Sequence, residues 1–180
     1  MDNNDLLRRL RYALSIDDAE TARLIKLGGG QATKSDASAW RAKENDDDFR
    51  VCDVDTVSCF LTGLITDRRG PPPGSANKKN TEGRSQQPPP KADNQLGVMD
   101  NNTVLKQLRI ALSFRSEDIH EILKAGGCQL TASEIGAFFR KPDARNYRTC
   151  GDQTVRQFIN GLTQRRDSIL HAPKHEPRKS

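Results

Sequence analysis

The chain has 180 residues, of which 34% are hydrophobic and 29% are charged, and its formal net charge is +5. No stretch approaches the roughly 18 consecutive apolar residues of a membrane-spanning helix, and the starting segment MDNNDLLRRL has no hydrophobic signal core. The composition therefore argues against a membrane partner and predicts a cytoplasmic protein.

The charge is divided unevenly along the chain. Residues 1–67 hold nine Lys/Arg and thirteen Asp/Glu, net −4, whereas residues 98–165 hold ten and seven, net +3. The segment between them adds +4, and the residues from 166 onward add +2. Positive charge gathered in one half of a chain is typical of proteins with an anionic partner.

Residues 1–69 and 99–167 are two copies of one sequence. Placing Met1 on Met99 aligns them without a gap, and 26 of the 69 pairs are identical. Such a duplication predicts two tandem modules of the same fold, an acidic copy 1 and a basic copy 2.

The segment between the copies, residues 70–98, has two proline triplets among Gly, Ser, Asn, Gln and Lys. It cannot bury enough apolar surface to offset the entropy of ordering it. We therefore expect a disordered linker here and, for the same reason, a flexible basic tail at residues 168–180.

Each copy is expected to fold into four helices, of which the first two are set by leucines and glycines. The first should follow the Asn pair of MDNN, because Leu7, Leu10 and Leu14 share one face. The second should span about 17–27 and end at the Gly28-Gly29 pair, since glycine permits the positive φ of a helix end.

The third and fourth helices are set by capping boxes and by an amphipathic stripe. Thr33-x-x-Asp36 and Thr131-x-x-Glu134 are capping boxes, which open the third helix. The stripe of the fourth helix consists of Val57, Phe60, Leu61 and Leu64, matched by Val155, Phe158, Ile159 and Leu162. No strand alternation is present, so the predicted fold class is all-α: two tandem four-helix modules, about eight helices.

Catalytic and metal-binding signatures are missing from the sequence. Among the four cysteines only Cys52 and Cys150 are equivalent in the two copies, and no C-x-x-C occurs. No phosphate-binding glycine loop and no H-E-x-x-H is present. We expect reduced, buried thiols, no disulfide, no metal, no cofactor and no enzymatic activity.

Several segments resemble a known family. RRLRYALS, ASAWRAKENDDDF, FLTGLITDRRG and IGAFFRKPDARNYRTCGDQTVRQFINGL, together with the duplicated plan, are similar to the YehS-like bacterial family, which carries a domain of unknown function, number 1456. The likeness covers both copies. It implies a bacterial origin and a fold, but no activity.

A cationic cluster in copy 2 is the candidate binding site. It consists of Arg140, Lys141, Arg145, Tyr147, Arg148 and Arg156. Arginine and lysine neutralise phosphates, and Tyr147 could stack on a base. In the alternative interpretation this is a solvated loop whose arginines pair with Asp143, Asp152 and helix C-termini, and Phe138 and Tyr147 fill the core. Copy 1 has mostly acids in the corresponding region, at 44–48.

Two functions remain open at this point. The first is a small accessory protein that binds RNA or a ribonucleoprotein through basic copy 2. Specific DNA reading is not expected, because the helix-turn-helix-like segment at 119–140 has a longer turn than that motif uses. The second is a protein-interaction adaptor or homo-oligomer that shares an apolar surface with its partner and does not bind nucleic acid.

Overall fold

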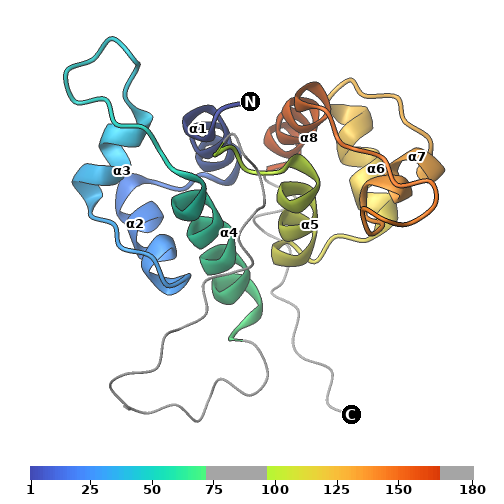
Figure 1. The fold of residues 1–180 in the computed structure, drawn as a ribbon, viewed down its shortest axis with the longest axis horizontal. Helices are drawn as coiled ribbons and strands as arrows, with labels where there is room; N and C mark the ends of the chain where they lie inside the picture. The colour runs from blue at the N-terminus through green and yellow to red at the C-terminus, as the bar shows by residue number, and fades with distance from the viewer. Residues whose placement is uncertain (72–96, 167–180) are drawn as a thin grey trace.

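The computed structural model describes residues 1–71 and 97–166. These residues form eight α-helices and no strand, which confirms the all-α prediction (Figure 1). The disorder predicted for the linker and the tail falls almost wholly on residues 72–96 and 167–180, which lie outside the described residues.

Both copies have the same order of four helices. Copy 1 comprises α1 (Asn3–Leu14), α2 (Asp18–Leu27), α3 (Lys34–Arg41) and α4 (Val54–Arg69). Copy 2 comprises α5 (Asn101–Ala111), α6 (Ser116–Ala125), α7 (Ala132–Phe138) and α8 (Asp152–Gln164). Within the two described segments, no helix is long and apolar enough to cross a membrane.

Side-chain caps set the helix starts. Asp2 and Asp100 accept hydrogen bonds from the backbone three residues on, so α1 and α5 begin at the first Asn of MDNN. The predicted start after the Asn pair is therefore wrong, because the aspartate and not the asparagine is the N-cap. The predicted capping boxes on Thr33 and Thr131 are confirmed.

Glycines let two helices of each copy cross with their backbones almost in contact. A Cβ atom on Gly63 of α4 would lie 1.8 Å from the Leu24 carbonyl oxygen of α2, and one on Gly161 of α8 would lie 1.9 Å from that of Ile122. The second helix of each copy ends at this crossing, where Gly29 has a φ of 91° and Gly127 one of 85°.

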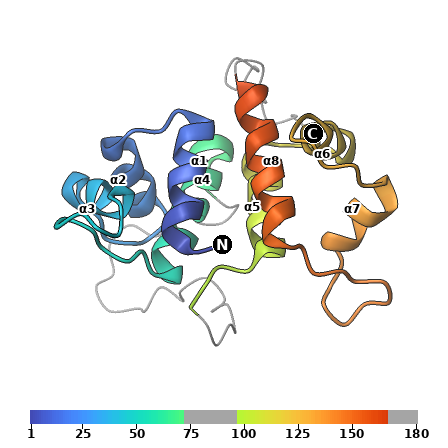
Figure 2. The ribbon, with the colours of Figure 1, turned by 90° about the horizontal axis from the view of Figure 1, so that it is seen from above.

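The two copies pack against each other through their first and fourth helices. Helix α1 packs on α8, and α4 packs on α5, so each contact is the counterpart of the other (Figures 1 and 2). Buried side chains of both copies form one continuous core. Asn3 joins the halves by donating to the Gly97 carbonyl at 2.9 Å and accepting from the Met99 amide at 3.0 Å.

The outer helices of each copy point away from this central packing. In Figure 1, α3 and the loop after it lie at one end of the long axis, and α7 with its loop lies at the other. The acidic segment 44–48 and the basic segment 140–148 are therefore at opposite ends of the molecule.

Candidate nucleic-acid interface

The loop that carries the cationic cluster, residues 139–151 between α7 and α8, is held by Asn102. The Asn102 side-chain amide donates to the carbonyls of Phe138 at 2.9 Å and Arg148 at 2.8 Å, and its oxygen accepts from the Cys150 amide at 2.8 Å. This buried side chain replaces the backbone partners that an irregular segment lacks.

The α3–α4 loop, residues 42–53 of copy 1, is held in the same way. Asn4 donates to the carbonyls of Trp40 and Arg50 at 2.9 and 2.8 Å, and it accepts from the Cys52 amide at 2.8 Å. The backbone turns also match: Phe49 donates to Asp46, as Tyr147 does to Ala144, both at 3.0 Å. The two loops are therefore one backbone scaffold with two different sets of side chains.

Arg148, a candidate site residue, is tied to the capping box of α7. Its guanidinium donates to Glu134 at 2.8 Å, as Arg50 does to Asp36 at 2.9 Å in copy 1. Hydrogen bonds from the Thr131 backbone, from Arg148 and from the Thr131 side chain lower the pKa of Glu134 to about 2. Arg148 thus forms an ion pair that has an equivalent in copy 1. Its partner, Glu134, is not one of the acids that the alternative interpretation named.

Arg140 also contacts its own loop. Its guanidinium donates to the carbonyls of Arg145 at 3.2 Å and Asn146 at 3.3 Å. Asn146 has a φ of 64°, a left-handed conformation in which asparagine is more common than most residues. Arg140 therefore bridges the loop across this turn.

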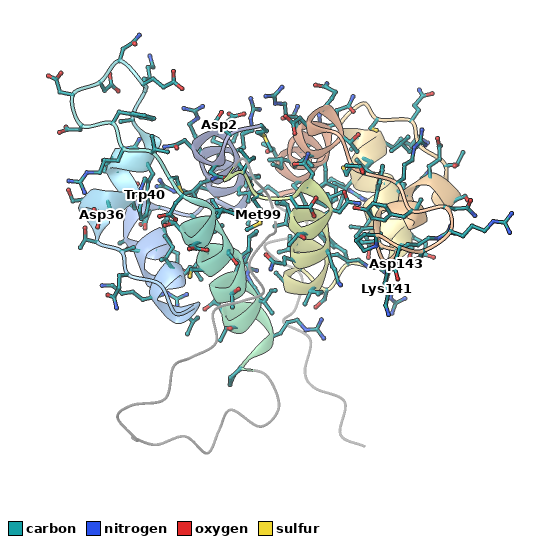
Figure 3. The ribbon with its side chains drawn as sticks, in the orientation of Figure 1. Asp2, Asp36, Trp40, Met99, Lys141 and Asp143 are labelled. Atoms are coloured by element: carbon teal, nitrogen blue, oxygen red, sulfur yellow. The ribbon has the colours of Figure 1, made fainter. Side chains whose placement is uncertain are left out.

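Lys141 and Arg145 form the exposed part of the cluster, next to Tyr147. Lys141 and Arg145 are exposed and Tyr147 is half-buried, and the two cationic side chains have no hydrogen bond or ion pair with residues 1–71 or 97–166. Figure 3 shows Lys141 and Asp143 at the outer edge of copy 2. These cations are available for phosphate contacts.

Arg156 does not belong to this cluster. It lies on α8 where that helix faces α1, with its Nε 3.8 Å from an Asp5 oxygen. Arg8 and Arg9 contact the same carboxylate at 3.1 and 2.9 Å. From the sequence, Arg156 on the fourth helix of copy 2 was grouped with the cations of the loop, but its ion pair with Asp5 directs its side chain toward copy 1.

A groove between α1 and α8 is a feature that the sequence analysis missed. It is lined by Asp5, Arg8, Arg9 and Tyr12 from α1 and by Ile159, Asn160, Thr163 and Gln164 from α8. Burial raises the pKa of Asp5, but hydrogen bonds from Arg9 and Arg8 outweigh it and hold the pKa below its usual value. The arginine pair in RRLRY is a sequence signal for this cationic groove. It was missed because copy 1 as a whole has a negative net charge.

The cysteines offer no reactive thiolate. Cys52, Cys128 and Cys150 are buried, Cys59 is half-buried, and all four are free thiols. Burial raises the pKa of Cys52 and of Cys150 to about 12, so both stay protonated at neutral pH. In the described segments, no group of three or more His, Cys, Asp or Glu side chains could hold a metal ion.

Comparison with known proteins identifies the family. The model of the family described as "Protein of unknown function (DUF1456)" matches residues 3–70 and 101–166, one match per copy. The uncharacterized protein YehS of Escherichia coli (strain K12) is 36% identical over 163 residues, which is 91% of this chain and 95% of that protein. No solved structure matches. The chain therefore belongs to the DUF1456 family, and each of its two copies is one match to that family's model.

Proposed function

We propose that this protein binds nucleic acid and is not an enzyme, with RNA or a ribonucleoprotein as its cytoplasmic partner. The observation that carries the proposal is the α7–α8 loop, a backbone held by Asn102 that exposes Lys141 and Arg145 beside the half-buried Tyr147. A preformed loop loses little conformational entropy on binding. When its cations contact phosphates, counterions held by those phosphates are released, and this release favours binding.

The comparison between the copies supports this assignment. In copy 1 the same scaffold has Asp47 at the position of Arg145 and the acids Glu44, Asp46 and Asp48 around it. Lys141 has a lysine, Lys43, as its counterpart, whereas Arg145 is replaced by an acid, so Arg145 is not needed to build the loop. Arg145 therefore distinguishes copy 2, as expected of a side chain kept for a ligand.

The adaptor hypothesis has less support among the described residues. It needs an apolar surface for a partner, but the apolar faces of the two copies cover each other in one core. The exposed large hydrophobic side chains there are Tyr12, Leu27 and Val51. Scattered exposed side chains of this kind are normal on a monomeric surface.

The test is fluorescence anisotropy of the full chain with a labelled RNA hairpin, a single-stranded RNA and a DNA duplex at low and physiological salt. The variant is Lys141→Ala with Arg145→Ala, which leaves Arg140 and Arg148 to hold the loop. We expect binding that weakens as salt rises, and a log–log salt slope lower by about 1.4 in the variant for single-stranded RNA, because about 0.7 is lost per phosphate contact.

The matched control is Lys43→Ala, the counterpart of Lys141 in copy 1, which should leave the slope unchanged. Absence of binding to all three polymers at low salt would overturn the proposed function. Capture of a protein partner, or self-association by light scattering, would then be the outcome that the adaptor hypothesis predicts.

A further inference from the structure

We propose that the α1–α8 groove binds a single-stranded segment of nucleic acid, with Tyr12 stacking on a base and Arg8 and Arg9 contacting phosphates. The inference rests on the proposed function and deepens it, since it adds a second contact surface and states the conformation of the ligand. It places that surface on copy 1, whose net charge is negative.

Tyr12 is the first observation. Its side chain is 68% exposed, and among residues 1–71 and 97–166 it is the only aromatic among the exposed large hydrophobics. It lines the groove between α1 and α8, and it also lines the adjoining hollow that extends toward α3. An aromatic face in this position is a stacking platform, which accepts any base because every base has a π-face.

The charge around Tyr12 is the second observation. Three guanidinium groups, those of Arg8, Arg9 and Arg156, contact the single carboxylate of Asp5, which leaves two positive charges in excess. Asp5 is only 11% exposed, whereas the three arginines are 37% to 46% exposed. The buried Asp5 carboxylate therefore fixes the three arginines in place, and the exposed parts of their guanidinium groups remain in contact with solvent.

The positive charge continues past Tyr12 into the adjoining hollow. Arg41 and Arg166 line that hollow together with Arg8. Of its two acids, Asp18 is already paired with Arg11 and, at 3.7 Å, with Arg41. A cationic track with a central stacking side chain is the arrangement that non-specific single-strand binding uses.

The internal duplication supplies the comparison that singles out this groove. The counterpart of the α1–α8 contact is the contact between α5 and α4. There Ile110 occupies the position of Tyr12 and Ile65 that of Thr163, and both isoleucines are partly buried. Gln107 replaces Arg9. The α4–α5 contact thus has aliphatic side chains at these positions, whereas the α1–α8 contact has an open groove of about 580 Å³, within the range of ligand sites.

The polar side chains on the α8 wall suit bases better than an apolar ligand. Asn160 and Gln164 are exposed amides, and Thr163 adds a hydroxyl. Amides can both donate and accept, so they can meet the edges of unpaired bases. A base-paired duplex would hide those edges and could not place a base on Tyr12.

The experiment measures anisotropy of the full chain with a labelled short oligouridylate and with a blunt RNA duplex. Tyr12→Ala should weaken single-strand binding about 5- to 100-fold, whereas Tyr12→Phe, which keeps the ring, should bind like the parent chain. Arg8→Ala with Arg9→Ala should lower the salt slope by about 1.4. Binding of the duplex should respond little to Tyr12→Ala.

Lys106→Ala is the matched control for Arg8→Ala, because Lys106 is its exposed counterpart on α5, and it should leave the slope unchanged. Unaltered single-strand binding by Tyr12→Ala would overturn the groove proposal. If only the loop variant, Lys141→Ala with Arg145→Ala, then lost binding, the proposed function would stand without the groove. If only the groove variants lost binding, the loop would be excluded and the groove supported. No binding by the parent chain would overturn both.

Discussion

The α3–α4 and α7–α8 loops share the same backbone arrangement but carry net charges of opposite sign. Asn4 and Asn102 hold them with the same three hydrogen bonds, and an arginine in each contacts the capping-box acid of the preceding helix. What both loops share is what the module needs to fold. What differs, above all Asp47 in one and Arg145 in the other, is what folding leaves free for a ligand.

The largest expected effect concerns the helix crossing that both copies share. Gly161→Ala places a Cβ 1.9 Å from the Ile122 carbonyl oxygen, and the backbone there cannot move away easily. We expect a loss of about 3 kcal/mol in the free energy of unfolding, and a similar loss for Gly63→Ala, measured by urea denaturation.

Gly136→Ala is the control for this prediction. A Cβ at Gly136 would meet nothing within 4 Å, so alanine should leave stability unchanged or raise it by about 0.5 to 1 kcal/mol. A Gly161→Ala protein as stable as this control would contradict the shared close crossing.

The second prediction separates folding from binding. Asn102→Ala leaves two carbonyls and the Cys150 amide without their partner, which should cost about 2 kcal/mol. Asn4→Ala should cost about the same by the same measurement. Only Asn102→Ala should also weaken RNA binding, because its loop has a net positive charge whereas the loop held by Asn4 has a net negative charge. Equal affinities in the two variants would argue against the loop as a binding surface.

These contacts show which parts of the fold could be predicted from the sequence. Periodicity, capping boxes and glycine stops lie within a few residues of one another, so the helices and the all-α class were predictable. The role of the Asn pair was not, because Asn102 contacts residues 36 and 46 positions away. The duplicated MDNN was visible, but no local rule connects it to a loop in another part of the chain.

The candidate site was predicted in part for the same reason. Lys141 and Arg145 are exposed, as expected of a binding loop, whereas Arg140 and Arg148 have partners within the fold. The groove depends on how the two copies pack, and the sequence left that packing open. Summing charge over each copy also hid Arg8 and Arg9, because residues 1–67 hold thirteen acids and nine cations, although four of those acids lie in the 44–48 loop at the far end.

The third prediction reverses the charge of one side chain in the copy 1 loop. Asp47→Arg puts a cation at the position of Arg145, on the matching backbone. The variant should gain RNA affinity, and its salt slope for single-stranded RNA should steepen by about 0.7, measured by anisotropy. Glu44→Lys, at the counterpart of Pro142, makes the same change of charge and is the control. An equal gain in both would mean that net charge and not loop geometry sets the affinity.

The smallest expected effect concerns acid stability. The pKa of Glu134 is lowered to about 2 in the folded chain by the Thr131 and Arg148 hydrogen bonds. A depressed pKa stabilises the fold above the unfolded value, near 4.3, and that contribution is lost as pH falls toward 2. The melting temperature of the parent chain should therefore drop more between pH 5 and pH 2 than that of Glu134→Gln. Parallel curves would contradict the ion pair.

The central claim is that two matching scaffolds carry different surfaces and that nucleic acid contacts the cationic ones. The most direct test is the change in backbone amide NMR shifts of the full chain when a single-stranded RNA is added. The account predicts shifts in residues 141–148 and along the α1–α8 groove, and none in residues 43–50. Shifts in 43–50, or none in either cationic surface, would contradict it.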